Sequence, residues 1–328
     1  MNASAKQGLF QAEIIADSYI RVDPRLTAEG FHRLTTIVIR FPRIVLAELN
    51  THRLFSRNSA SSRAIPVEKM LESVLENPFV PNRFPLTHKG MQADQWIEWD
   101  DPRFSEFVDQ WFWARDQVVA IAMRLHRQGI SKQLVNRFLE PVLMHTVIVS
   151  STEWSNFFKL RVSDAAQNEI HIIAELMLDA MNHSKPALLQ PGEWHLPFGD
   201  RFDQDRLNQA FQELHDTDLQ VESIEELMRN VAVARCARVS YDDFLGKDNY
   251  VADARLYKRL HSMGHWSPFE HVARAMNKTE YSQYAQSSPD GVEFGWSANF
   301  RGFVQLRRTF ERDVENLPDD RLLPVSLA

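Results

Sequence analysis

A dense polar segment follows directly on an apolar one near the start of the chain, and this pair constrains the fold most. Thr36–Leu49 is rich in β-branched and other apolar residues, which predicts a strand over Thr35–Ile39 and then a helix from Pro42 to Leu49. The next thirteen residues, Thr51–Arg63, contain one histidine, three arginines, one asparagine and four serines. Arginine and serine side chains match phosphate oxygens. A solvated basic loop is the simpler interpretation of a basic cluster, but the interleaved serines and the preceding core-like run favour an anion site.

Composition limits the classes of protein to which the chain can belong. Its 328 residues can bury a large core in one domain or two. The formal net charge of −7 argues against general nucleic-acid binding, although a local basic pocket still suits a phosphorylated small molecule. No run approaches the roughly 20 apolar residues of a membrane span, and the first residues lack the apolar core of a signal peptide. The single cysteine, Cys236, excludes an intrachain disulfide and fits a reducing cytoplasm, so we expect a cytoplasmic protein in which Cys236 is a small buried residue.

Hydrophobic periodicity and turn residues divide the rest of the chain into elements. The predicted helices are Val67–Glu76, Phe104–Gln128, a short helix capped by Ser131, a helix from Ser163 or Asp164 to about Asn182, Asp205–Leu214, Glu222–Asn230, Asp248–Met263 and a last basic helix over Asn299–Glu311. Ala232–Tyr241 is predicted as a separate short element, residues 1–30 as an irregular or short-strand lead-in, and residues 79–102, 184–204 and 285–295 as loops.

A second polar segment contains an arginine held close to aromatic residues. Asn156 and Arg161 lie five residues apart, and Phe157, Phe158 and Leu160 are expected to anchor them in the core. An arginine held in this way suits recognition of a phosphate or a base edge. The alternative is an ion pair with Asp164 or Glu169, and the residues alone do not decide between the two.

A third segment, Gly264–Val272, reads G-H-W-S-P-F-E-H-V. Its His265, Glu270 and His271 could be half of a metal site, but no fourth ligand is evident and the turn is tight. We expect a packed structural turn and no metal. The dinucleotide, P-loop, zinc-protease and nucleophile-elbow signatures do not occur in the sequence, so side chains and helix ends must hold any nucleotide or flavin.

The three segments together resemble the flavin-dependent thymidylate synthases. That family carries R-H-R-x-x-S-x-N-x-x-S-x-R-Y, N-F-x-x-L-R followed by A-Q-x-E-I, A-R-x-V-L-P, G-H-x-S-P-F-E-H and A-R-V-S-Y. The matching residues here are His52, Arg53, Ser56, Asn58, Ser61 and Arg63; Asn156, Phe157, Leu160, Arg161, Ala166, Gln167, Glu169 and Ile170; Arg137, Leu139 and Pro141; and the segments 264–271 and 237–241.

The order of these segments differs from that of the family. The last two precede R-H-R in the family and follow it by about two hundred residues here, so the chain resembles a circular permutation, which is tolerated where termini lie close together. We expect residues 1–190 to carry the R-H-R-like and N-F-x-x-L-R segments and residues 205–328 to carry the S-P-F-E-H segment and a C-terminal helix, in one compact unit. The resemblance implies an α/β (α+β) fold with a central antiparallel sheet flanked by long helices.

The resemblance also implies a reaction. A one-carbon unit passes from methylenetetrahydrofolate to C5 of a pyrimidine deoxynucleotide, with FAD as cofactor and NADPH as reductant, in a homo-oligomer that is a dimer or a tetramer. The implied catalytic residues are Ser61, Arg161 and His265; the implied cofactor-binding residues are His52, Arg53, Asn58 and Asn156; the implied substrate-binding residues are Glu48, Ser61, Arg63, Arg137 and Arg161.

Four departures from the family leave the substrate open. Thr51 stands where the family has the first arginine, Glu48 where it has a glutamine, Ser59 where it has an acidic residue and Ala64 where it has a tyrosine. A carboxylate can accept from the amino group of cytosine, so the substrate could be dUMP or dCMP and the product methylated or hydroxymethylated. A non-catalytic flavin- or nucleotide-binding paralogue is the third alternative.

Overall fold

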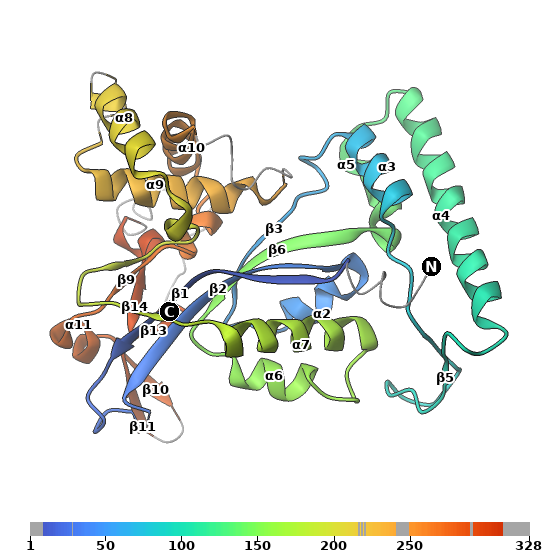
Figure 1. The fold of residues 1–328 in the computed structure, drawn as a ribbon, viewed down its shortest axis with the longest axis horizontal. Coiled ribbons are helices and arrows are strands. Elements are labelled where there is room, and N and C mark those ends of the chain that lie inside the picture. Colours follow the sequence, from blue (N-terminus) through green and yellow to red (C-terminus); the bar gives the residue numbers. More distant parts are fainter. Residues whose placement is uncertain are drawn as a thin grey trace, which may run out of the picture.

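The fold is built on a five-stranded sheet with helices on both sides (Figure 1). The computed structural model describes residues 9–27, 29–215, 217, 219, 221–240, 249–288 and 291–310. The strand order is β3-β6-β2-β1-β7, with bounds β1 Gln11–Arg21, β2 Phe31–Pro42, β3 Ser56–Ser59, β6 Met144–Ser151 and β7 Ala187–Leu188. All pairs are antiparallel except β1 with β7. The predicted α/β fold class with a central antiparallel sheet is therefore confirmed.

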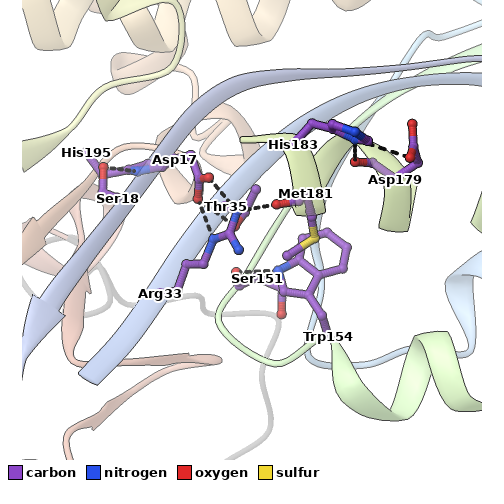
Figure 2. A network of polar contacts seen from close by, with 10 residues as sticks. All are labelled: Asp17, Ser18, Arg33, Thr35, Ser151, Trp154, Asp179, Met181, His183 and His195. Atoms are coloured by element: carbon purple, nitrogen blue, oxygen red, sulfur yellow. Dashed lines mark hydrogen bonds and ion pairs between the residues drawn. The ribbon is translucent and has the colours of Figure 1, made fainter. Parts of the chain in front are cut away.

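Strand β1 shows that the predicted lead-in over residues 1–30 was wrong within the described residues. β1 pairs with β2 from Gln11↔Arg40 to Arg21↔Phe31, with a bulge between Ile14 and Ala16. The sequence pattern did not predict this strand because some of its buried side chains are polar. Residues distant in the sequence provide their hydrogen bonds. Arg33 and Thr35 of β2 donate to the Asp17 carboxylate at 2.6–2.9 Å, and Arg33 Nη2 also donates to the Met181 carbonyl oxygen of α7 (Figure 2).

One face of the sheet carries the largest core. Helices α2 (Leu46–Asn50, after the 3₁₀ turn η1, Arg43–Val45), α6 (Ser155–Arg161) and α7 (Asn168–His183) lie on this side (Figure 1). Sheet residues such as Ile37, Ile39 and Val149 pack there with Phe157 and Ile173 of the helices. The helix predicted after Pro42 is thus present. Helix α7, however, begins at Asn168 and not at Ser163 or Asp164, because the backbone folds into a turn in which Ala166 N donates to Ser163 O.

Two helical groups lie across the sheet from α6 and α7 (Figure 1). One contains α3 (Val67–Glu76), α4 (Phe104–Arg127), α5 (Lys132–Val135, capped by Ser131) and the 3₁₀ segment η2 (Asn136–Val142). The other contains α8 (Gln204–His215), α9 (Ile224–Ala237), the turn η4 (Arg238–Ser240) and α10 (Tyr250–Ser262). Helix α9 joins two elements predicted as separate, because its second half is buried on all sides from Val231 to Cys236, Arg235 included. Position 241, the predicted end of the second element, lies outside the described residues.

The predicted last helix over Asn299–Glu311 was wrong. Its described residues form β13 (Phe300–Arg301), β14 (Phe303–Gln305) and the 3₁₀ turn η6 (Leu306–Thr309), and Glu311 lies outside the described residues. Gly302 explains this: its φ of +82° interrupts any helix, and a Cβ there would lie 2.5 Å from Ile20 Cδ1. β14 instead pairs with β9 (Ala273–Ala275), which also pairs with β8 (Trp194–His195).

The remaining elements are short. The segment 79–102 is the predicted long loop, interrupted only by β4 (Phe84–Pro85) and β5 (Trp96–Ile97). The predicted loop 285–295 instead contains an antiparallel pair of strands, β10 (Ala285–Ser288) and β11 (Gly291–Phe294), preceded by α11 (Lys278–Gln283) and followed by β12 (Trp296–Ser297). The 3₁₀ turns η3 (Gly199–Arg201) and η5 (Ser267–Glu270) complete the list. In the part of the chain that the structure describes, no helix combines the length and the apolar character needed to cross a membrane.

Candidate functional site

Arg161 joins the two most informative sequence segments. From the end of α6, its Nε donates to His52 Nε2 at 3.1 Å, and its Nη2 donates to Thr51 Oγ1 at 3.2 Å. The Thr51 hydroxyl in turn donates to the Glu48 carbonyl oxygen at 2.7 Å. In the sequence, Arg161 is separated from His52 by 109 positions and from Thr51 by 110. The contacts bring these residues together where α2 meets α6, and we call Glu48, Thr51, His52 and Arg161 the α2–α6 group.

His52 is a neutral acceptor in this group. Its ring is buried, stacks on Phe55 with ring centroids 5.7 Å apart and meets the edge of Phe157 at 4.9 Å. Burial lowers the pKa of His52, and the charges of Arg161 and Arg57 lower it further. Because Nε2 accepts from Arg161, the ring proton belongs on Nδ1. The neutral ring therefore fixes the orientation of the Arg161 guanidinium by a hydrogen bond and leaves its positive charge unneutralised.

Glu48 contributes one carboxylate oxygen that meets no hydrogen-bond donor in the part of the chain that the structure describes. Its Oε2 atom is buried and has no hydrogen-bond partner among the described residues. Leaving a buried carboxylate oxygen unpaired costs free energy, and a ligand that donates a hydrogen bond there would recover it. This atom lies in the same helix turn whose carbonyl accepts from Thr51.

Two arginines in the R-H-R-like segment have different surroundings. Arg57 donates to the carbonyl oxygens of His52 at 3.1 Å and Leu49 at 3.3 Å, so it clamps the loop between α2 and β3. Burial lowers the pKa of Arg57. The negative charge of Glu270 raises this pKa, and the positive charge of Arg53 lowers it. Arg53 is exposed and faces solvent. Sequence reasoning gave no role to Arg57, although its position between His52 and Asn58 was the available signal.

Asn58 connects the sheet edge to the third sequence segment. Its Nδ2 donates to the Cys236 carbonyl oxygen at 2.6 Å, and its Oδ1 accepts from Ser267 Oγ at 3.1 Å. The S-P-F-E-H segment therefore lies against β3, and exposed His265 is two residues from this contact. Cys236 is buried as expected, and burial raises the pKa of its thiol far above the ordinary value.

The end of the R-H-R-like segment, residues 61–63, lies beside η2. Ser62 Oγ and Arg137 Nη1 both donate to Glu140 Oε1, at 3.0 and 2.8 Å. Asn136 Nδ2 donates to the Ser62 carbonyl oxygen at 2.7 Å. Neighbouring Ser61 is half-buried, and Arg63 and Arg137 are exposed. The structure thus joins Ser62, between Ser61 and Arg63 in the sequence, to Arg137 through Glu140. Sequence reasoning missed the roles of Ser62 and Glu140; the i,i+3 spacing of Arg137 and Glu140 was the signal.

The other predicted residues of α6 separate into two kinds. Phe157 is buried and belongs to the core under the site. Leu160 is half-exposed, so it was wrongly predicted to anchor the segment, because at the end of a seven-residue helix it faces outward. Asn156 is exposed on the first turn of the same helix.

Comparison with known protein families identifies the segment that carries most of these residues. A sequence model of the family described as thymidylate synthase complementing protein matches residues 31–187. The match covers somewhat less than half of the 328-residue chain. The matched segment contains every predicted site residue except His265, and it ends before the segments on which the permuted order rests, so the permutation stays a prediction.

Solved structures of one protein are similar to part of the chain. One is a UMP/dUMP methylase PolB from Streptomyces cacaoi bound with 5-Br UMP, at 17% identity and a TM-score of 0.42, covering 52% of this chain and 88% of that chain. The same methylase bound with 5-Br dUMP gives 20% identity and a TM-score of 0.38, covering 46% of this chain and 67% of that chain. A search of the curated proteins gives no match.

Proposed function

We propose that the protein transfers a one-carbon unit from methylenetetrahydrofolate to C5 of a pyrimidine deoxynucleotide, converting dUMP to dTMP. The observation that carries the proposal is the 3.1 Å hydrogen bond from Arg161 to His52, which joins the R-H-R-like and N-F-x-x-L-R segments within the matched segment. The chemistry of the relative bound with 5-Br dUMP points in the same direction.

The nucleotide is assigned to the cationic and hydroxyl groups along the R-H-R-like segment. Ser61, Arg63 and Arg137 would bind its phosphate, because exposed guanidinium forks and a hydroxyl are the groups that phosphate oxygens accept from. Arg161 and Glu48 would contact the pyrimidine ring. Ser61, Arg161 and His265 are the proposed catalytic residues, which orient the ring and the one-carbon donor.

The residues present fit a flavin. Exposed Arg53 and Asn156 can donate to a pyrophosphate, and the α2–α6 group lies on a packed base of Phe55, Trp154 and Phe157. We assign FAD to His52, Arg53, Asn58 and Asn156. When bound and reduced by NADPH, the flavin supplies the hydride that the transfer requires. His52 contributes by holding Arg161, and Asn58 by holding the turn that carries His265.

The exposed position of several of these residues suits a site completed by a second copy of the chain. Arg53, Arg63, Arg137 and His265 all face solvent in the single chain. We therefore propose a homo-oligomer, a dimer or a tetramer, that acts in the cytoplasm on free nucleotides and binds neither nucleic acid nor membrane.

Mass spectrometry of the nucleotide products tests the reaction. The purified protein is loaded with FAD, reduced with NADPH and incubated with methylenetetrahydrofolate and dUMP or dCMP. We expect dTMP from dUMP and a flavin absorption band in the purified protein. A yellow protein that leaves every nucleotide unchanged would contradict the proposal and favour a non-catalytic binding paralogue.

A second candidate follows from Glu48. Its buried and unpartnered Oε2 can accept from the exocyclic amino group of cytosine, which uracil lacks. Thr51 replaces the family's arginine and engages Arg161 instead. A product from dCMP alone, or a hydroxymethylated product, would establish this variant, and Glu48→Gln should then shift preference toward dUMP.

A further inference from the structure

A cavity of about 550 Å³ lies on the face of the sheet that α6 and α7 do not cover. Its floor is a row of cross-strand neighbours, Gln11 of β1, Arg40 of β2 and Thr146 of β6, which point to one side because they are paired in register. Helix α3 and the segment around η3 form its walls. Its volume lies within the roughly 300–1,000 Å³ of small-molecule sites.

The lining of this cavity is strongly cationic. Arg40, Arg43, Lys69 and Arg201 face it, and Glu13 is the acidic residue in the lining. Arg201 donates to Glu13 at 2.6 Å, but the Glu13 side chain is 61% exposed, so this pair is weak and screened by salt. An excess of cations in one concave place is unexpected in a chain whose formal net charge is −7.

Arg43 is fixed in position at the cavity by two partners. Its Nη2 lies 3.3 Å from Glu140 Oε1, and its Nη1 donates to His145 Nε2 at 2.9 Å. Burial lowers the pKa of His145 to about 3, and Arg43 contributes to this, so His145 is a neutral acceptor. A guanidinium that is already held in one orientation loses little rotamer entropy when it binds an anion.

The cavity also has an apolar side. Val38 on the floor and Phe198 and Val239 opposite α3 line it, beside the hydroxyls of Ser62 and Ser73. The three apolar side chains offer a surface for a flat ring, and the cations offer donors for phosphoryl oxygens. None of the residues assigned above to the flavin, the nucleotide or catalysis lines this cavity, which adjoins the assigned phosphate residues at Ser62, between Ser61 and Arg63 in the sequence.

We propose that this cavity is a second anion site, separate from the catalytic site, which binds a phosphorylated ligand of nucleotide size. The cations would contact the phosphoryl groups through charge-assisted hydrogen bonds, and the apolar side would contact the base. The same phosphoryl chemistry could come from inorganic pyrophosphate, which lacks the base.

Calorimetric titration of the full-length protein tests the site with three probes: ADP, inorganic pyrophosphate and adenosine. We expect ADP to bind and adenosine not to bind. The double variant Arg40→Gln, Lys69→Gln should bind ADP about tenfold more weakly or worse, because two charge-assisted contacts are lost. The single variant Lys69→Glu, at an exposed helix position, should weaken binding in the same direction and guards against a folding defect in the double variant.

Two matched controls locate the binding. The double variant Arg124→Gln, Arg127→Gln removes the same charge from the exposed surface of α4 and should bind ADP as the wild type does. Arg161→Ala, in the α2–α6 group, should also leave ADP binding unchanged. Pyrophosphate binding as tight as that of ADP would support the site and identify an inorganic ligand.

The proposal is overturned if neither ADP nor pyrophosphate binds the wild-type protein, or if the Arg40 and Lys69 variants bind ADP normally. Loss of ADP binding in Arg161→Ala alone would also overturn it, by placing ADP in the catalytic site. The titrations require no turnover, so their failure leaves the proposed reaction untouched.

Discussion

Two polar groups next to the same sheet contain similar side chains and differ in their surroundings. The α2–α6 group includes one histidine, a half-exposed guanidinium and a buried carboxylate oxygen with no hydrogen-bond partner among the described residues. The other group, which we call the buried row, consists of Ser18, His195, Thr36, Ser150 and His271. Its consecutive contacts are 2.9, 2.8, 2.6 and 2.8 Å, and all five residues are buried.

The groups differ most clearly in the hydrogen bonding of His195 and of Glu48 Oε2. In the buried row, the two nitrogens of His195 face the Ser18 and Thr36 hydroxyls, so one donates and one accepts. Burial lowers the pKa of His195 and of His271 to about 3, which keeps both rings neutral. The α2–α6 group instead carries charge and leaves the Glu48 carboxylate open. A histidine with both nitrogens satisfied holds the fold together, whereas a charged and incompletely satisfied group is suited to a ligand.

The sharpest test of this contrast is the replacement of Arg161. Arg161→Ala should lower kcat/KM for the nucleotide about 10²–10³-fold, because a fixed donor at the reacting ring is lost. The free energy of unfolding should fall by only about 1 kcal/mol, since the side chain is half-exposed. Lys159→Ala on the same helix, at an exposed position, is the matched control and should change neither quantity. Equal activity losses in both variants would remove Arg161 from the site.

The buried row should show the opposite pattern. His195→Leu should destabilise the protein by about 2–4 kcal/mol, because Ser18 is left buried and unpaired. His271→Leu should cost less, since His271 Nε2 already has no hydrogen-bond partner among the described residues. Urea denaturation of both variants measures the difference. A larger loss of unfolding free energy in His271→Leu would contradict this prediction and show that the bond between His271 and Ser150 stabilises the row more than the bonds of His195 do.

Acid should destabilise the fold through its buried histidines, which bind protons more readily in the unfolded chain than in the folded one. The pKa values of His32, His145, His195 and His271 are about 4, 3, 3 and 3, all lowered chiefly by burial from 6.5. Below about pH 6.5 the unfolded chain therefore binds protons that the folded chain does not, and stability decreases as the pH falls toward these values. Each histidine contributes a slope of about 1.4 kcal/mol per pH unit. His195→Leu should have a shallower slope by one such contribution, and an unchanged slope would show that His195 is not the buried neutral group described here.

A surface cap gives the smallest expected effect and serves as a reference for purely local structure. Asn277 and Glu280 form a capping box at the start of α11, with Glu280 N donating to Asn277 Oδ1 at 2.9 Å. Asn277→Ala should lower the free energy of unfolding by about 1 kcal/mol and leave kcat/KM unchanged. A change in kcat/KM would show that α11 communicates with the site.

The sequence determined the features that depend on neighbouring residues. Helix α3 spans Val67–Glu76 as predicted, and Ser131 caps α5, because helical periodicity and capping are properties of a few adjacent residues. The R-H-R-like segment also placed His52, Asn58 and Ser61 in one short stretch before any fold was known. The single buried cysteine followed from composition in the same way.

Only the tertiary structure decided what depends on distant partners. Strand β1 exists because β2 pairs with it and Arg33 neutralises buried Asp17, and β14 exists because β9 lies beside it and Gly302 turns the chain. The bond between Arg161 and His52 and the open Glu48 oxygen depend on how α2 meets α6. Burial and long-range hydrogen bonds are set by the packed structure, and no local pattern of residues records them.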